Sequence, residues 1–562
     1  VVDFAAPSVD DRRRSDLSGR APLVHDFTWT ADPDFETRTA TFRFADWAER
    51  FPAEIERARR AFGEDAPLEL RDVTIEALIQ PERAVQAERH VEATAAALFF
   101  YGLWFGEYPF ERITVVDPAW GARAAGGMEY PTIFTAGTRL FTDSTMHSPE
   151  SVTIHEAGHQ WFYLLSANNE FEAAWLDEGL NSYADSEVIA RVYGPRRGTT
   201  DYMGVPVDGR RLFSFGRGKL GSGLTLRSVP VPPLDWIGLD DLATVRPVRT
   251  NGILDWWRDQ PLLSAAPERS DVRWSDRGSA INGDHADPID TWAWRSKTRS
   301  SHYTNTYSRT ATILRSMPAF LEASTGEDGD AAFLRAIRGF ATEWRFRHPY
   351  PDDFFVAMEA HDGLDLELDW FFAELFRQVS TVDWRLDVRE VVEPELLGAT
   401  RGDDGRFVIA AEVEPEVPEA ADEDPEAAGE EPVDQETTVP ETVAADDDPD
   451  AGEERVWEIA LEREGNLALP VLVRLNFENG TSAEFVWTRA EQLGERWLKV
   501  RYASRSPLVS AVVDPDGGYY LEQSRANNGW YADRGGLSVT RWTERIFAQA
   551  ASFLRFQKGL GG

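Results

Sequence analysis

The alternation of apolar and polar residues near the N-terminus predicts two strands. Residues 22–46 are rich in Thr and Phe, with one candidate strand around His25–Thr30 and a second around Thr37–Phe44. Period-two alternation is typical of a strand that buries one face. The apolar run Arg112–Asp117 predicts a further short, buried strand, and a glycine-rich turn follows it at Gly121–Gly127.

Helical spacing of the apolar positions dominates two later stretches. The first runs from 82 to 105, and the second from 303 to about 376, with turns at His348–Asp352 and His361–Gly363. Strands that precede helices in this way favour an α+β fold. The repeating face of the first helical stretch consists of Val85, Val91, Ala95, Leu98 and Phe99.

After Trp384 the pattern returns to strands. Val471–Phe477 alternates and leads into Asn479–Gly480, which is the strongest short signal for a hairpin. We therefore expect a small β-sandwich in 385–411 and 455–525. Residues 412–454 are acidic and Pro-rich, with too little apolar surface to offset their ordering entropy, and predict a disordered loop within the sandwich.

Two regions have weaker patterns. Residues 196–300 are rich in Gly, Pro, Arg and Trp and show little periodicity, which predicts an insertion with local structure only. Within 526–562, Trp542–Gln557 has the pattern of an amphipathic helix with mostly basic charges. Packing onto the acidic body of the protein is the first interpretation, and weak contact with a membrane surface is the alternative.

Charge and composition exclude several classes of function. The 562-residue chain has a formal net charge of −39, so nucleic acid is not an expected partner. It has no cysteine, which excludes disulfides, a thiolate metal site and a Cys nucleophile. No apolar run reaches the length of a transmembrane helix. The absence of Cys and the appended sandwich favour the bacterial periplasm or export, with the cytoplasm as the alternative.

The stretch His155-Glu-Ala-Gly-His159 carries the candidate chemistry. Residues four apart lie on one face of a helix, so both imidazoles can hold one ion while Glu156 reaches its water. Glu178 follows after eighteen intervening residues, on a helix that opens at Trp175, and supplies a third ligand. Two His and one Glu leave the fourth tetrahedral position of Zn²⁺ to water, as in catalytic sites. We expect one zinc ion per chain.

These residues and Gly126-Gly-Met-Glu-Tyr130, just upstream, resemble the zinc and exopeptidase motifs of the M1 metallopeptidases, the aminopeptidase N family of gluzincins. The segment Trp344–Phe355 is similar to the helical region of bacterial members. The resemblance covers roughly residues 20–385, apart from the insertion. The common Gly-Ala-Met-Glu-Asn is replaced here by a variant that keeps Glu129.

The resemblance implies a thermolysin-like catalytic domain with a helical subdomain. By this resemblance only the last strands of the family's N-terminal β-domain would fit before Asp46, so we expect either a fragment or a cleft that is more open than usual. The expected domains are as follows: a remnant of that β-domain at 1–45, the catalytic domain at 46–195, the insertion at 196–300, the helical part at 301–384, the sandwich at 385–411 and 455–525, the acidic loop at 412–454, and the C-terminal helix at 526–562.

The resemblance also implies removal of N-terminal residues from peptides with a free N-terminus. Glu156 would act as general base, and Glu129 would pair with the substrate's α-amine. The remaining substrate-binding residues of the motif would be Gly126, Gly127 and Met128. For the oxyanion donor the best match is Tyr307, although Arg309 and Thr310 stand where the family has Lys and Gly; Tyr303 is the alternative.

Two other functions stay open at this point. One is a zinc endopeptidase of the thermolysin type, which the Glu129 motif disfavours. The other is a catalytically inactive M1-like scaffold that binds partners, which the intact set of His155, Glu156, His159 and Glu178 disfavours.

Overall fold

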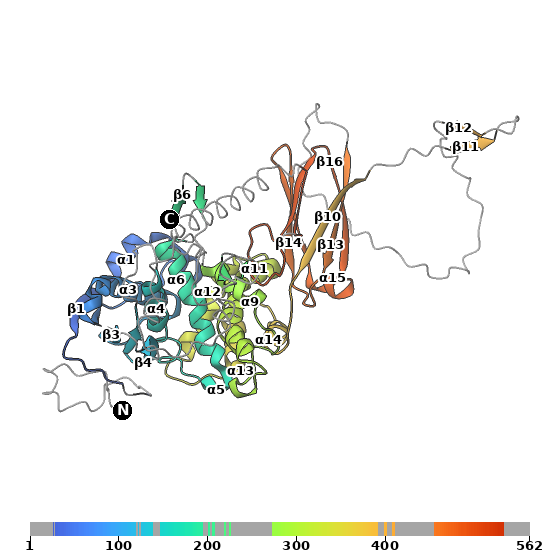
Figure 1. Cartoon of the computed structure of the whole chain (residues 1–562). Helices are drawn as coiled ribbons and strands as arrows, with labels where there is room; N and C mark the ends of the chain where they lie inside the picture. Colours follow the sequence, from blue (N-terminus) through green and yellow to red (C-terminus); the bar gives the residue numbers. More distant parts are fainter. Residues whose placement is uncertain are drawn as a thin grey trace, which may run out of the picture. The chain divides into compact units, whose positions relative to one another are not determined.

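The protein is represented by a computed structural model, and its described residues fall into two compact units (Figure 1). Of the described residues, those up to 381 and 517–523 belong to unit 1, and those in 382–516 and 524–532 belong to unit 2. The structure describes residues 26, 28–119, 122, 125–138, 147–194, 200–202, 205–207, 219–220, 224–225, 272–391, 398–401, 407–410, 454–525 and 527–532. The predicted C-terminal helix and acidic loop, apart from Glu454, lie outside these ranges.

A five-stranded mixed sheet forms one layer of unit 1. The strand order is β1-β2-β3-β5-β4, and only β2-β3 and β3-β5 are parallel pairs. The buried strand expected after Arg112 is confirmed as β3. The bounds are β1 Glu36–Phe42, β2 Val73–Ile79, β3 Arg112–Val116, β4 Gly127–Tyr130 and β5 Ile133–Ala136.

The N-terminal expectations need correction. Thr28–Thr30 have no regular structure, so the first of the two predicted strands is wrong where the structure describes it. The second strand is real, but β1 pairs along its whole length with β2. Residues 36–42 are therefore an edge strand of the unit 1 sheet and not part of a separate β-domain. Alternation alone could not specify this distant partner.

Helices pack against this sheet and make up the rest of unit 1. The helical prediction for 82–105 is confirmed as a 3₁₀ segment, η2, followed by α3, which is almost entirely buried. Figure 1 shows α3 and α4 beside strands β1, β3 and β4. The bounds are α1 Phe44–Arg50, α2 Pro52–Phe62, η2 Pro81–Gln86, α3 Ala87–Phe105, α4 Ser148–Gly158, α5 Glu170–Ala174, η4 Trp175–Gly179 and α6 Leu180–Tyr193.

The second helical stretch is also confirmed, and it begins earlier than predicted. A helix, α9, lies inside the segment expected to be an insertion with local structure only, and it packs against α6 and η9. The end of that segment therefore belongs to the helical body of unit 1. The bounds are α9 Val272–Asn282, η8 Ala293–Arg295, α10 Arg299–Tyr303, η9 Thr304–Arg309, α11 Thr310–Thr325, α12 Gly329–Glu343, α13 Pro351–His361 and α14 Asp369–Phe376.

Short strand pairs complete the described part of the predicted insertion. They are β6 (Thr200–Tyr202) with β7 (Val205–Val207), and β8 (Lys219–Leu220) with β9 (Leu224–Thr225). Among all described residues, no helix is both long and apolar enough to cross a bilayer.

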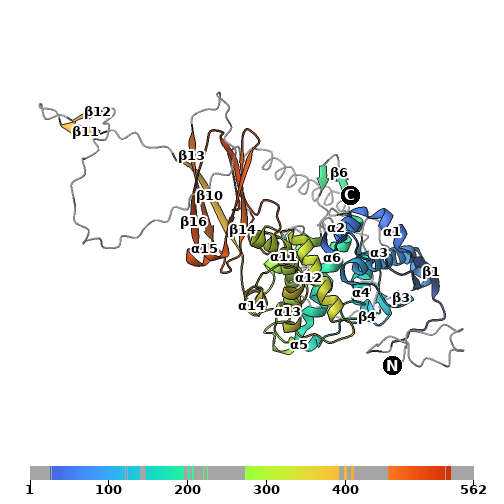
Figure 2. The ribbon, with the colours of Figure 1, turned by 180° about the vertical axis from the view of Figure 1, so that it is seen from behind.

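Unit 2 contains two larger sheets, as the alternating pattern predicts (Figure 2). Strands β11 and β12, which lie within the predicted sandwich segment 385–411, pair only with each other as a separate two-stranded sheet. One has the order β10-β13-β16 and the other β15-β14-β17-β18, and inward side chains such as Trp384 and Trp487 are fully buried. The Asn479–Gly480 hairpin joins β14 to β15. The bounds are β10 Trp384–Val391, β11 Gly398–Arg401, β12 Phe407–Ala410, β13 Arg455–Arg463, β14 Val471–Phe477, β15 Ser482–Trp487, α15 Arg489–Gly494, β16 Trp497–Ser504, β17 Leu508–Val513 and β18 Gly529–Tyr531.

Two predicted boundaries change at the end of the sandwich. Residues 517–523 belong to unit 1, where the backbone N–H of Leu521 donates to Ser316 Oγ (3.1 Å). Gly529–Tyr531 pair with β17 and so belong to the four-stranded sheet, although 526–562 was expected to be a C-terminal helical region. The whole is a mixed fold of helices and several sheets, and its thermolysin-like arrangement stays a prediction.

Candidate metal centre

Helix α4 carries the first two candidate ligands. It starts with Pro149 in its first turn, where a missing N–H costs nothing, and ends at Gly158. A Cβ at Gly158 would lie only 2.0 Å from Asn181 Oδ1, so the helix approaches α6 closely at this point. Asn181 Nδ2 in turn donates to the His155 carbonyl (2.7 Å). These contacts fix the end of α4, and with it both imidazoles.

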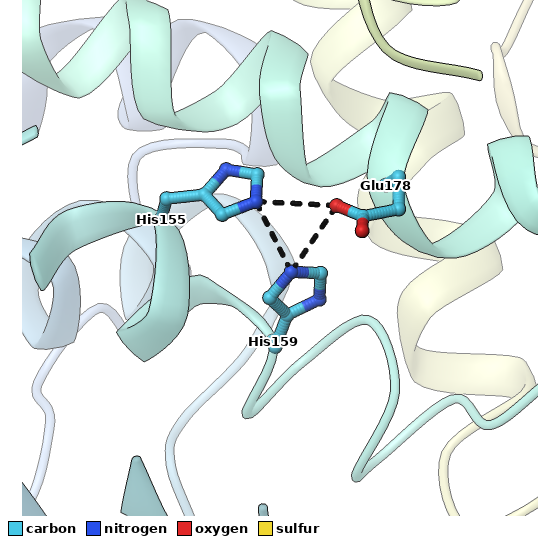
Figure 3. A group of neighbouring side chains, drawn as sticks. All are labelled: His155, His159 and Glu178. Carbon is cyan, nitrogen blue, oxygen red and sulfur yellow. Dashed lines mark hydrogen bonds and ion pairs between the residues drawn. The ribbon is translucent and has the colours of Figure 1, made fainter. Parts of the chain in front are cut away.

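The three predicted ligands meet at one point (Figure 3). His155 Nε2 lies 3.1 Å from Glu178 Oε2 and 3.3 Å from His159 Nε2, and His159 Nε2 lies 3.4 Å from Glu178 Oε2. Zinc bonds of about 2.0–2.1 Å in a tetrahedron separate their ligand atoms by about 3.3–3.4 Å. The triangle of donor atoms therefore has the size of one face of a tetrahedral zinc site.

Each imidazole is oriented by a carboxylate on its other nitrogen. Asp185 Oδ2 lies 2.7 Å from His155 Nδ1, and Asp177 Oδ1 lies 2.6 Å from His159 Nδ1. The second pair is fully buried. A carboxylate at Nδ1 fixes the tautomer in which Nε2 is free to bind a metal, and it increases the basicity of the ring.

The charges of this cluster depend on these contacts. Burial alone would lower the pKa of His155, but hydrogen bonds with Asp185 and Glu178 outweigh it and raise the pKa to about 10. Burial acts against ionisation of Glu178 as well, yet both histidines hold the pKa of that carboxyl well below its ordinary value. Protons on the imidazoles thus supply the positive charge that a divalent cation would replace.

Glu156 lies beside the ligands without being one of them. Its side chain is 6% exposed, and its Oε2 has no hydrogen-bond partner among the described residues. Burial raises the pKa of Glu156 to about 7, which suits a group that must take up and release a proton. A Cβ at Gly127 would approach Glu156 Oε1 to 2.7 Å, so glycine at that position leaves room for the carboxylate.

The Gly126–Tyr130 motif includes β4, the edge strand of the unit 1 sheet, and lies beside the candidate ligands. Met128 and Glu129 lie on β4, which pairs with β5, and Gly126 accepts a bond from the Gly137 N–H (2.7 Å). The Glu129 carboxylate lies within 4.8 Å of ligand atoms of Glu156 and His159. Gln160 is completely buried and donates to the Tyr130 carbonyl (2.9 Å). Gln160, which directly follows His159, therefore ties the motif to the two candidate histidine ligands.

Tyr307 reaches the same cluster from η9. Its hydroxyl donates to Glu178 Oε1, while its ring stacks near that of His155. Tyr303, the alternative, is 53% exposed and lies next to the Tyr307 ring, with centroids 6.1 Å apart. Arg309, which stands where the family has Lys, is buried and bonds to Asn305 Oδ1 (3.4 Å). The structure thus brings Tyr307 to the predicted ligands and leaves Tyr303 at the surface.

Both Glu178 and Tyr307 lie on π-helical turns, η4 and η9. Such turns contain one residue more than an α-helical turn and are frequent at functional sites. The two turns contact each other closely, because a Cβ at Gly179 would lie 2.8 Å from the Thr306 carbonyl oxygen. The small residue in one turn therefore lets the other approach.

Residues 89–208 match the family model described as Peptidase family M1 domain. The chain is therefore similar to the M1 peptidases over this segment, which includes His155, His159 and Glu178. Over 113 residues it is 31% identical to leucine aminopeptidase 2 of Ajellomyces capsulatus, an alignment that covers 20% of this chain and 16% of that protein. Over 91 residues it is 33% identical to a leukotriene A-4 hydrolase homolog of Botryotinia fuckeliana, covering 16% and 13%.

A solved structure is also similar. Legionella pneumophila aminopeptidase A, in complex with aspartic acid, gives a TM-score of 0.43 at 11% identity, covering 87% of this chain and 38% of that one. The sequence alignments cover only 16% and 13% of the length of the two relatives above.

The sequence patterns did not predict the residues that support the candidate ligands. Asp177, Asp185, Asn181 and Gln160 were not predicted, although Asp177 directly precedes Glu178 within a buried run. The position of Asp177 could have predicted its role, because an acid buried beside a metal ligand needs a partner. The sequence contains no such signal for Asp185, since its contact with His155 depends on how α6 crosses α4.

Proposed function

We propose that this protein is a zinc-dependent aminopeptidase of the M1 family that hydrolyses N-terminal residues from peptides. The observation that supports this best is the triangle of His155, His159 and Glu178 atoms at 3.1–3.4 Å, with a carboxylate behind each imidazole. These residues would hold one zinc ion. When bound, zinc polarises a carbonyl and lowers the pKa of water.

Glu156 would move the proton. The attacking water would give a proton to the Glu156 carboxylate, which would later pass it to the leaving amine. Its unpartnered, buried Oε2 and its pKa of about 7 support this assignment. A carboxyl group without a fixed partner can change its protonation state without breaking a structural bond.

Tyr307 would stabilise the negative charge that develops on the scissile carbonyl oxygen. Its hydroxyl lies at the edge of the ligand triangle, where it donates to Glu178 Oε1. A preorganised donor of this kind lowers the barrier because it is aimed at charge that exists only in the transition state.

Glu129 would make the site prefer a chain end. It lies on an edge strand within 4.8 Å of Glu156, at a spacing that lets a carboxylate pair with the protonated α-amine of a bound peptide. An endopeptidase has no use for a carboxylate there, because an internal peptide nitrogen is uncharged.

The test compares one peptide with a free and with an acetylated N-terminus, with and without a zinc chelator. We expect cleavage of the free peptide only, lost on chelation and regained with zinc. Glu156→Gln should keep one zinc by mass spectrometry and abolish turnover. Equal cleavage of both peptides would favour an endopeptidase instead. Metal-free protein, or bound zinc without cleavage of any peptide in a broad panel, would favour an inactive scaffold.

A further inference from the structure

Helix α9 places a carboxylate beside the residues that support the metal centre. This helix, Val272–Asn282, falls within the segment expected to be an insertion with local structure only. The Oδ2 atom of Asp276 on α9 lies 2.6 Å from the hydroxyl oxygen of Ser186, which directly follows Asp185 on α6. Asp185 is the carboxylate at His155 Nδ1. A side chain from the predicted insertion is therefore connected by three contacts to a candidate ligand.

The Ser186 hydroxyl has several acceptors within reach but a single hydrogen to donate. Its Oγ lies 2.6 Å from Asp276 Oδ2, 2.8 Å from the Ser182 carbonyl oxygen and 3.0 Å from Asp185 Oδ1. A hydrogen bond to a charged acceptor is roughly twice as strong as one to a neutral acceptor. The Asp276 carboxylate is both charged and nearest when it is ionised, so it takes this hydrogen in preference to the other two.

Arg315 holds Asp276 in place from the other side. The Arg315 side chain is buried, with its Nη2 3.4 Å from Asp276 Oδ2 and its Nε donating to Glu187 Oε1 (2.9 Å). Its guanidinium also lies over the ring of Tyr520, 5.4 Å from the centroid. Burial raises the pKa of Asp276 to about 6, and the Arg315 charge opposes this shift. The Asp276 carboxyl is therefore mostly ionised at slightly alkaline pH.

The arrangement matters for the charge of Asp185. Among the described residues, the Asp185 carboxylate contacts His155 Nδ1 at 2.7 Å with one oxygen and Ser186 Oγ with the other. A hydrogen bond from the hydroxyl would stabilise the Asp185 charge and so weaken its pull on the imidazole. When Asp276 takes the hydroxyl hydrogen, the Asp185 charge acts on His155 alone, which strengthens that imidazole as a metal ligand.

We propose that Asp276 is a positioning residue of the metal centre, which holds the Ser186 hydroxyl away from the charge of Asp185 and so keeps Asp185 a strong partner of His155. This inference rests on the zinc site of the proposed function and not on the cleavage of peptides. It gives the end of the predicted insertion a role in the centre, through a carboxylate that acts on the ligands by way of α6.

The experiment measures zinc affinity by competition with a fluorescent chelator at slightly alkaline pH. It compares the full chain with Asp276→Asn, with Ser186→Ala and with the double variant. Asp276→Asn leaves Asp185 as the charged acceptor beside the hydroxyl, so zinc binding should weaken about 3- to 5-fold, less than for loss of the Asp185 charge itself. Ser186→Ala should not weaken zinc binding, because it removes the hydrogen that would reach Asp185. The double variant should then match Ser186→Ala.

A matched control removes the same charge just after α9. The carboxylate of Asp284 accepts from the Thr298 hydroxyl and from the Ala286 N–H. Asp284→Asn should therefore leave the zinc affinity unchanged.

A merely structural role of Asp276 predicts a different pattern. If Asp276→Asn weakens zinc binding equally with and without Ser186→Ala, Asp276 acts by packing and the inference is wrong. Unchanged zinc affinity in Asp276→Asn would overturn it too. If circular dichroism shows that Asp276→Asn does not fold, Ser186→Ala still decides, because weaker zinc binding in that variant would mean that the hydroxyl supports Asp185.

Failure of the proposed function gives a separate result. If the unchanged protein binds no zinc, the zinc proposal fails and this inference falls with it. If the unchanged protein binds zinc but the two substitutions are additive, only the assignment of Asp276 is lost.

Discussion

Replacement of Asp177 by Asn removes the charge next to His159 Nδ1 while keeping the shape of the side chain at position 177. The Asn carbonyl can still accept from Nδ1, and the Phe162 carbonyl lies 3.0 Å from the same nitrogen, so the ring should keep its tautomer. The change therefore removes mainly the negative charge that strengthens the imidazole as a ligand.

The size of the effect follows from burial. Loss of a supporting carboxylate typically costs about 10- to 100-fold in metal affinity. The Asp177–His159 side chains are 1% and 1% exposed, whereas His155 and Asp185 are 19% and 14% exposed, and water screens the second pair more. We expect Asp177→Asn to weaken zinc binding about 100-fold, or about 2.7 kcal/mol, and Asp185→Asn about 10-fold.

Competition with a fluorescent zinc chelator at neutral pH measures both affinities, with Glu172→Gln as the control. That variant also loses one negative charge near the site but touches neither imidazole, so its zinc affinity should equal that of the unchanged protein. An Asp185→Asn loss as large as the Asp177→Asn loss would refute the reasoning from burial. Unchanged affinity in both would show that these carboxylates do not support metal ligands.

Two further predictions concern the tyrosine and a glycine. Tyr307→Phe should lower kcat about 100-fold or more with zinc retained, while Tyr303→Phe should not; a large loss for Tyr303→Phe alone would reverse the choice. Gly158→Ala should lower the free energy of unfolding by about 1–3 kcal/mol in urea titrations, because its Cβ would meet Asn181 and Tyr101. Gly278→Ala, which places a Cβ in open space on α9, should not, and equal stability of both variants would contradict the close packing of α4.

Local patterns in the sequence were enough where the structure is local. The i, i+4 histidines need only one helix, and the Asn479–Gly480 turn needs only its two strands, so both were predictable. The strand at β1 was predicted but assigned to the wrong domain, and the helix α9 was not predicted, because the places of both depend on partners far along the chain.

The site follows the same division. The candidate ligands share a recognisable spacing, but Asp185 meets His155 only because α6 packs against α4. No spacing in the sequence encodes that packing. Tyr307 lies between the two cases, since the resemblance identified it while its contact with Glu178 required the fold.

The two π-helical turns make the protein intolerant of an otherwise harmless change. An α-helix advances about 100° per residue, so deletion of one residue from η4 or η9 would restore regular helical bonding and rotate everything on one side of the deletion by that angle. Shortening either turn should therefore stabilise the backbone hydrogen bonding of the helix, but it should also move Glu178 or Tyr307 away from the histidines. Loop trimming and consensus design, which reward regular helices, would select against the very irregularity that assembles this centre.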